Sequence, residues 1–175
     1  MPNDVNKYID WTNEGEEIKE NARKKYGSVT RTVKNQEYFF REALTYSQIS
    51  SKGKFSVRYM PSNCIFDQKG CCIFLKRHDL YFMLGLLNSK LIDNVLNKLN
   101  PTNSKAIMDI ERLPFVEPEE AIVMRISELA KIATKAKEEL LGFNYTSDFY
   151  HDVEIEYGLK NGATNVHEAY FRYVG

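Results

Sequence analysis

The sequence lacks several patterns that would assign it to a class of protein directly. Its nine glycines form neither a Gly-x-Gly-x-x-Gly nor a Gly-Lys-Ser motif, so no phosphate-cradling loop is predicted. The longest apolar run, Leu80 to Leu87, contains a glycine and is far shorter than the roughly 20 residues of a membrane-spanning helix. The first ten residues contain no apolar stretch of the kind found in signal peptides. We therefore expect no contact with a membrane and no secretion.

Cysteine is also scarce, because the chain has three cysteines and two of them are adjacent. An odd number without paired spacing predicts no disulfide framework and favours a reducing, cytoplasmic location. Cys64, Cys71, Cys72 and His78 contain no Cys-x-x-Cys pair, and thiols on apolar segments are more often core residues than zinc ligands. We predict no metal site and no catalytic residue in this chain.

The balance of charge differs between the two parts of the chain. Residues 1–115 hold 18 Lys and Arg against 13 Asp and Glu, whereas residues 116–175 hold 6 against 11. Within the first part, residues 19–58 contain ten basic and three acidic residues, a local charge of +7. Such clustering is typical of a nucleic-acid surface, although a solvated basic face is the alternative interpretation.

The N-terminal third begins with a helix pattern. Asn13 is the expected N-cap, followed by acidic residues in the first turn, and the helix should end near Tyr26, before Gly27. Its acidic residues come early and its basic residues late, the order that complements the helix dipole. This helix therefore needs no ligand to explain its charges.

Short strands are predicted in the next segment. Residues Lys54 to Met60 alternate between apolar and polar side chains, which indicates a half-buried strand with a basic outer face. Cys64 to Phe66 and Cys71 to Leu75 read as two further strands joined by a hairpin turn. The hydroxyl-rich stretch Thr45 to Lys54 is expected to be a turn.

Helical periods dominate the remainder. Asp79 to Leu99 predicts one amphipathic helix, capped by Asp79 and interrupted by polar residues at 88–90. Asp109 to Phe115 suggests a short turn and an edge strand. A helix closed by Gly142 is then predicted from a 4-3-4-3-4 apolar seam, which we expect to pack on a second helix of this protein or of a partner. The seam consists of Ile122, Ile126, Leu129, Ala133, Ala136 and Leu140.

These patterns together predict an α+β fold in which helices pack on a small mixed or antiparallel sheet. We expect two regions: an α/β domain over residues 1–116, and over residues 117–175 a helical spacer with an acidic, tyrosine-rich and partly helical tail.

Several blocks also resemble a known family. The blocks KYIDWTNEGEEIKE, YFFREALTYSQISSKGKFSVRYMPSNCIFDQKGCCIF, YFMLGLLNSKLIDNVLNKLNPT and DIERLPF resemble the C-terminal target-recognition region of PglX-type adenine-specific DNA methyltransferases of BREX phage-defence systems. The similarity spans about Lys7 to Phe115, and the blocks occur in the order of the family. More distantly, the layout resembles the specificity subunits of type I restriction-modification systems, in which a spacer helix follows the recognition domain.

The resemblance implies double-stranded DNA as the ligand and a target-recognition domain as the fold. The chain lacks the Asn/Asp-Pro-Pro-Tyr/Phe motif and the glycine-rich loop of such enzymes, so S-adenosylmethionine and catalysis would belong to a methyltransferase domain elsewhere. The chain itself would then use no cofactor and would not be an enzyme on its own. The residues implied to line or support the DNA face, with Gln48 added as a base reader, are Arg41, Thr45, Ser47, Gln48, Ser51, Lys52, Lys54, Ser56, Arg58, Tyr59, Asn103 and Lys105.

A second function stays open. Residues 120–141 and the C-terminal tail would suit a protein-interaction module that binds no DNA, and in that case the basic strand would only be solvated.

Overall fold

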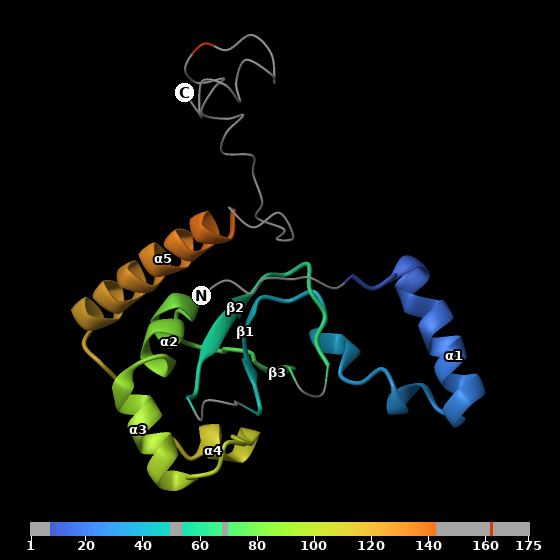
Figure 1. Ribbon diagram of the computed structural model, residues 1–175, viewed down its shortest axis with the longest axis horizontal. Helices are drawn as coiled ribbons and strands as arrows, with labels where there is room; N and C mark the ends of the chain where they lie inside the picture. The colour runs from blue at the N-terminus through green and yellow to red at the C-terminus, as the bar shows by residue number, and fades with distance from the viewer. Residues whose placement is uncertain (1–7, 50–53, 68–69, 143–161, 163–175) are drawn as a thin grey trace, which may run out of the picture.

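The fold is described here from a computed structural model, which defines residues 8–49, 54–67, 70–142 and 162. Within these residues a three-stranded antiparallel sheet is packed against helices, and a long helix follows near the end of the described chain (Figure 1). The α+β prediction is confirmed. No helix in the described residues is long and apolar enough to cross a membrane.

The sheet has the strand order β2-β1-β3, with β1 (Ala43–Ser47) in the centre. The strands β2 (Val57–Met60) and β3 (Gly70–Ile73) both pair with β1 in antiparallel fashion. Leu44 and Tyr46 of β1 face the helices and are almost completely buried. The sheet is therefore organised around a strand whose second half, from Thr45, we had expected to belong to a turn.

The predicted strand at residues 64–66 and the predicted hairpin that follows it are wrong. Residues Cys64 to Phe66 form no strand, and the predicted hairpin between them and Cys71 to Leu75 is absent. Residues 70–73 pair with β1 instead, because β1 offers them the apolar partners Leu44 and Tyr46 on the buried face. The predicted strand from Lys54 is shorter than expected, since the ladder begins at Val57.

The hydrophobic core lies between the sheet and the two helices α2 (Leu80–Leu87) and α3 (Lys90–Leu99). The predicted helix from Asp79 to Leu99 is thus two helices. Asp79 caps the first as expected, because its carboxylate accepts a hydrogen bond from the Phe82 N–H at 2.7 Å. The residues buried in this core are Leu44, Tyr46, Phe55, Val57, Leu84, Leu87, Ile92 and Leu96.

The helix is interrupted between α2 and α3, because polar side chains there form hydrogen bonds with β2 and with the first turn of α3. The Asn88 side chain accepts a hydrogen bond from Val57 N–H at 3.0 Å and donates to the Val57 and Leu84 carbonyls at 2.9 and 2.8 Å. Ser89 then caps α3 by accepting from Ile92 N–H. The polar residues that looked like an interruption therefore join the helices to β2.

The helix α4 (Ile107–Glu111) replaces the predicted turn and edge strand. Its first turn is held by the Asp109 carboxylate, which accepts hydrogen bonds from Ala106 N–H and from the Asn100 side chain, both at 2.8 Å. These bonds satisfy a free N–H group at the helix start, and this favours a helix over an extended chain.

The long helix α5 (Glu120–Gly142) packs on α2, and Gly142 is the last residue of this described segment. Its buried positions are shifted by about one residue from the predicted seam and include Ser127, Ala130, Thr134 and Leu141. The contact is close, since a Cβ added to Gly85 would lie 2.6 Å from Ile126 Cγ2. Most of the predicted seam is therefore exposed, and the prediction of a seam that packs on another helix of the described residues is wrong except at Ile126.

An N-terminal arm stands to the side of the sheet, opposite α5 (Figure 1). It contains η1 (Thr12–Gly15), α1 (Glu16–Tyr26), η2 (Val29–Arg31) and η3 (Gln36–Tyr38). The helix ends at Gly27 with a left-handed φ of 70°, as expected. The predicted cap at Asn13 is wrong, because that residue lies inside η1 and Gly15 precedes α1 without a side-chain cap.

Candidate nucleic-acid interface

Several of the predicted DNA-contacting residues meet at one end of the sheet. Ser47 and Gln48 stand where β1 ends, and Ser56 immediately precedes β2 on the neighbouring strand. The later loop joins them there, because Lys105 N–H donates to the Gln48 carbonyl at 2.8 Å and Ile49 forms a bridge with Ser104. We call this group the sheet-end cluster, and it consists of Ser47, Gln48, Lys54, Ser56 and Asn103. The predicted residues Ser51 and Lys52 lie outside the described residues.

Arg58 and Thr45 lie opposite one another on neighbouring strands. They project from the sheet face that points away from the buried Leu44 and Tyr46. Arg58 is half-buried and Thr45 is only 7% exposed, so Arg58 is the more accessible of the two. Across the sheet from Thr45, burial raises the pKa of the Cys72 thiol to about 11, although a hydrogen bond with Thr45 opposes the shift. That thiol stays protonated at neutral pH and is not a nucleophile.

Tyr59 projects from the other face of β2. Its ring stacks on Tyr81 of α2 with the centroids 6.0 Å apart, and its hydroxyl donates to Glu42 Oε1 at 2.5 Å. Burial and this hydrogen bond both raise the pKa of Tyr59. The side chain therefore links β2 to α2 and supports the sheet rather than lining the same face as Arg58.

Arg41 lies before β1, at the opposite end of that strand from Gln48. Its guanidinium is placed over the rings of Tyr38 and Phe74, at 5.3 and 5.6 Å from their centroids. Cation–π contacts of this kind leave the N–H groups at the edge of the guanidinium plane available to a further acceptor. Arg41 and the sheet-end cluster are thus separate contact points, not one site.

Lys105 is buried, and its ammonium group is bonded to the carbonyls of the loop around it. It is 3% exposed, and its ammonium group donates to the Asn100 carbonyl and, at 2.9 Å, to the Thr102 carbonyl. Asn100 in turn donates to Asp109, and this hydrogen bond is the main cause that lowers the pKa of the Asp109 carboxyl. We therefore leave Lys105 out of any DNA-contacting surface and assign it to the loop that presents Asn103.

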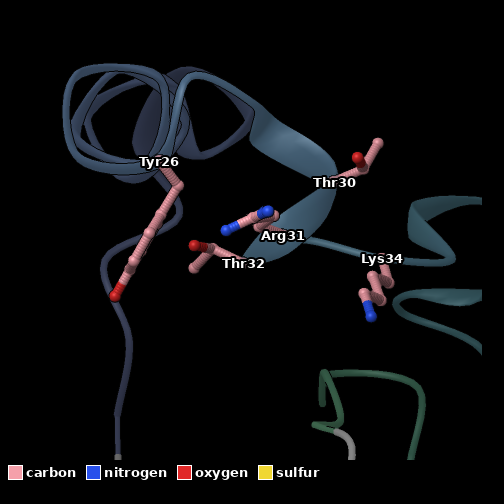
Figure 2. A pocket seen from close by; sticks show the side chains of 5 residues that line it. All are labelled: Tyr26, Thr30, Arg31, Thr32 and Lys34. Atoms are coloured by element: carbon pink, nitrogen blue, oxygen red, sulfur yellow. The ribbon is translucent and has the colours of Figure 1, made fainter.

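A hollow of about 610 Å³ lies where the arm turns after α1, and the sequence did not single it out as a site. Figure 2 shows Arg31 and Thr32 projecting toward the side on which Tyr26 hangs from the end of α1. Thr30 and Lys34 complete the lining. The only signal in the sequence was the basic cluster of residues 19–58, which contains Arg31 and Lys34 but does not indicate a hollow.

No group of three or more His, Cys, Asp or Glu side chains is arranged to hold a metal ion within the described residues. The arrangement offers cations, hydroxyls and amides at the surface. Such groups bind phosphates and base edges.

No protein-family model matches the chain. Two relatives do match it over part of its length. One is an adenine-specific methyltransferase PglX of Lacticaseibacillus casei (strain Zhang), 35% identical over 142 residues that make up 81% of this chain. The other is an adenine-specific methyltransferase BrxX of Escherichia coli O9:H4 (strain HS), 30% identical over 112 residues, or 62% of this chain.

Part of this chain is homologous to adenine-specific methyltransferases. The matched regions make up only 12% of the PglX protein and 8% of the BrxX protein. The resemblance noted from the sequence blocks is therefore confirmed as homology over part of the chain, and the activity of the full-length relatives is not carried over to this chain by the match itself.

Proposed function

We propose that this chain is a DNA-recognition segment of an adenine-specific DNA methyltransferase in a BREX-type phage-defence or restriction-modification system. The observation that carries the proposal is the partial homology to PglX and BrxX, which joins the chain to proteins named for methylating adenine. In this proposal the catalytic domain and its S-adenosylmethionine lie outside these 175 residues, because the chain contains no methyltransferase motif.

The surface charges support a DNA ligand. Lys54 is exposed and Arg58 is half-exposed, and neither forms an ion pair with any residue that the structure describes. Cations without an ion pair, at the sheet end and on the open face of β2, can neutralise backbone phosphates without first breaking an internal salt bridge. Lys52 belongs to the same proposed group from its place in the sequence.

Base reading is assigned to neutral polar groups of the sheet-end cluster. The Gln48 backbone is fixed by the hydrogen bond from Lys105 N–H, while its side chain is only half-buried. An amide of this kind can pair bidentately with an adenine edge in the major groove, at a discrimination of about 1–3 kcal/mol per base. Ser47, Ser56 and Asn103 surround it with further donors and acceptors.

Salt-dependent binding of duplex DNA tests the proposal. The 175-residue chain, alone and with the methyltransferase domain of its parent protein supplied, is titrated with duplex DNA at low and moderate salt. Each phosphate contact contributes about 0.9 to the slope of log affinity against log salt. Changing Lys52, Lys54 and Arg58 to Gln should therefore reduce the slope by about 3 and weaken all duplexes alike.

The matched control removes the same charge elsewhere, by changing Lys98, Arg125 and Lys135 on α3 and α5 to Gln. We expect this control to bind as the unmodified chain does. Absence of binding at both salt concentrations, with and without the methyltransferase domain, would reject the proposal.

A protein-interaction module is the second candidate, and one observation favours it. The exposed side of α5 carries the apolar side chains of Ile122, Leu129, Ile132 and Leu140, which are 48–66% exposed. An apolar stripe of this kind marks a contact surface in many proteins. In this candidate the tail of residues 143–175, which lies outside the described residues except residue 162, also contributes.

A further inference from the structure

The hollow at the end of α1 has the composition of a phosphate site. Its five lining side chains provide one guanidinium, one ammonium and three hydroxyls, and none of them is acidic. All five residues are exposed to an incoming ligand, although the Thr30 hydroxyl already shares a hydrogen bond with Ser28.

The cations of the hollow differ from their neighbours on the same arm. Arg23 and Lys24 are neutralised within α1 by Glu16 and Glu20, at 2.7 and 3.0 Å. Arg31 and Lys34 form no ion pair with a described residue. Lys19 and Lys25 lie over the rings of Trp11 and Tyr26, at 5.7 and 5.3 Å from the ring centroids. Arg31 and Lys34 line the hollow without such a partner among the described residues, so their charges are available to an anion.

The backbone that presents these cations is held in place. Thr32 N–H and Val33 N–H both donate to the Val29 carbonyl, at 3.0 and 2.9 Å, and the Val33 side chain is buried. The Ser28 and Thr30 hydroxyls lie 2.9 Å apart in a mutual hydrogen bond. Because the turn is fixed before a ligand arrives, less conformational entropy is lost on binding.

We infer that this hollow binds a phosphodiester of the DNA backbone, as a second anchor set apart from the sheet-end cluster. The inference rests on the proposed function for its ligand. Arg31 and Lys34 neutralise the phosphate, while the hydroxyls of Tyr26, Thr30 and Thr32 donate to its oxygens or to the flanking sugars. A contact on the arm and another at the sheet end fix the orientation of the duplex on the protein.

The test compares two charge-matched double variants of the full chain. Arg31→Gln/Lys34→Gln should lower the salt slope by about 1.8, so a rise from 50 to 200 mM salt weakens its DNA binding about 12-fold less than it weakens the unmodified chain. Arg23→Gln/Lys24→Gln removes the same charge from the same arm, but from residues that are already paired, and its slope should change much less. Both pairs are exposed, so circular dichroism should show an unchanged fold.

A third variant separates this inference from the proposed function. If Lys54→Gln/Arg58→Gln lowers the slope and Arg31→Gln/Lys34→Gln does not, the second anchor is refuted while DNA recognition stands. If the unmodified chain binds no duplex, both fail for DNA. Free phosphate is the other possible ligand of the hollow, and a titration with inorganic phosphate alone, followed by amide chemical shifts, tests it. Chemical-shift changes confined to residues 30–34, without any effect of the variants on DNA binding, would assign the hollow to free phosphate and overturn the inference.

Discussion

Replacing Gly85 with Ala tests how α5 is seated on α2. Gly85 lies in the interior of α2, where helix propensity alone makes Ala more favourable than Gly by about 1 kcal/mol. The structure predicts the opposite sign. The new methyl group would lie 2.6 Å from Ile126 Cγ2, 3.5 Å from the Ile126 carbonyl oxygen and 3.6 Å from Ala130 Cβ.

The size of the effect follows from these distances. Carbon atoms in good contact are about 3.5–4.0 Å apart, so Ile126 or the whole of α5 must move by about 1 Å. Overpacking of this kind costs about 1–3 kcal/mol. After the gain in helix propensity is subtracted, we expect the free energy of unfolding to fall by about 0–2 kcal/mol, instead of rising by about 1 kcal/mol.

Urea denaturation of a double-mutant cycle measures this cleanly. In an Ile126→Ala background the clashing Cγ2 is gone, so Gly85→Ala should there be neutral or stabilising, and the coupling between the two positions should be about 1–3 kcal/mol. Additive effects, or a stabilising Gly85→Ala change in the unmodified chain, would refute the described packing of α5 on α2.

Three further predictions concern stability. Asn88→Ala should lower the free energy of unfolding in a urea titration by about 1–2 kcal/mol, because it removes three hydrogen bonds that water can replace only in part. The control Asn97→Ala changes an exposed residue and should have little effect in the same titration. Lys105→Met should lower the free energy of unfolding by about 1–3 kcal/mol, because two loop carbonyls lose their donor. The folded variant should still bind duplex DNA in the salt titration as the unmodified chain does. Burial would raise the pKa of Asp79, but hydrogen bonds from Ser127 and from the start of α2 outweigh burial and lower that pKa below 3.8. The ionised carboxylate therefore stabilises the fold above pH 3.8, and this stabilisation is lost as the pH falls through the lowered pKa. The stability difference between the unmodified chain and Asp79→Asn should therefore shrink between pH 6 and pH 3, and a constant difference in urea titrations would contradict the assignment.

Helix ends were predictable where a local signal determines them. Gly27 ends α1 as expected, and Asp79 caps α2 through its own carboxylate. These features depend on residues a few positions apart. A single sequence contains all the information that they need.

The break after α2 was not predictable in the same way. The apolar period continues on both sides of the polar residues 88–90, and the reason for the break is a contact between Asn88 and Val57, 31 residues earlier. The central strand was missed because hydroxyl residues hid the alternation of Leu44 and Tyr46. Both errors concern partners that are distant in the sequence.

The face of α5 shows why hydrophobicity alone was misleading. Two sets of positions with steps of three and four run along this helix, and the more apolar set includes Ile122, Leu129 and Leu140. The set that packs on α2 contains Ser127 and Thr134 instead. Small residues let the two helices approach closely, and Gly85 leaves room on α2 for Ile126, the seam residue that packs there.

For the candidate site, residue types can be read from the sequence, but the positions of the side chains cannot. Ser47, Gln48 and Asn103 lie at one sheet end, although Ser47 and Asn103 are 56 positions apart in the sequence. Lys105 was assigned from its charge, and only the structure shows that its ammonium group is buried among carbonyls. Whether a lysine faces solvent is decided by the path of the backbone, which composition does not reveal.

The hydrogen bonds that Asn88 and Asp93 make to β2 also bear on self-association. The outer side of β2 is the side on which a strand from another molecule would add, and there the Val57 N–H and carbonyl groups and the Phe55 N–H group are already occupied. Groups that are already bonded cannot pair with an added strand, so this part of the β2 edge is protected from edge-to-edge association. Removing the Asn88 side chain would therefore weaken the fold and also free the Val57 N–H and carbonyl groups to pair with another molecule. The variant should lose solubility at concentrations where the unmodified chain stays in solution.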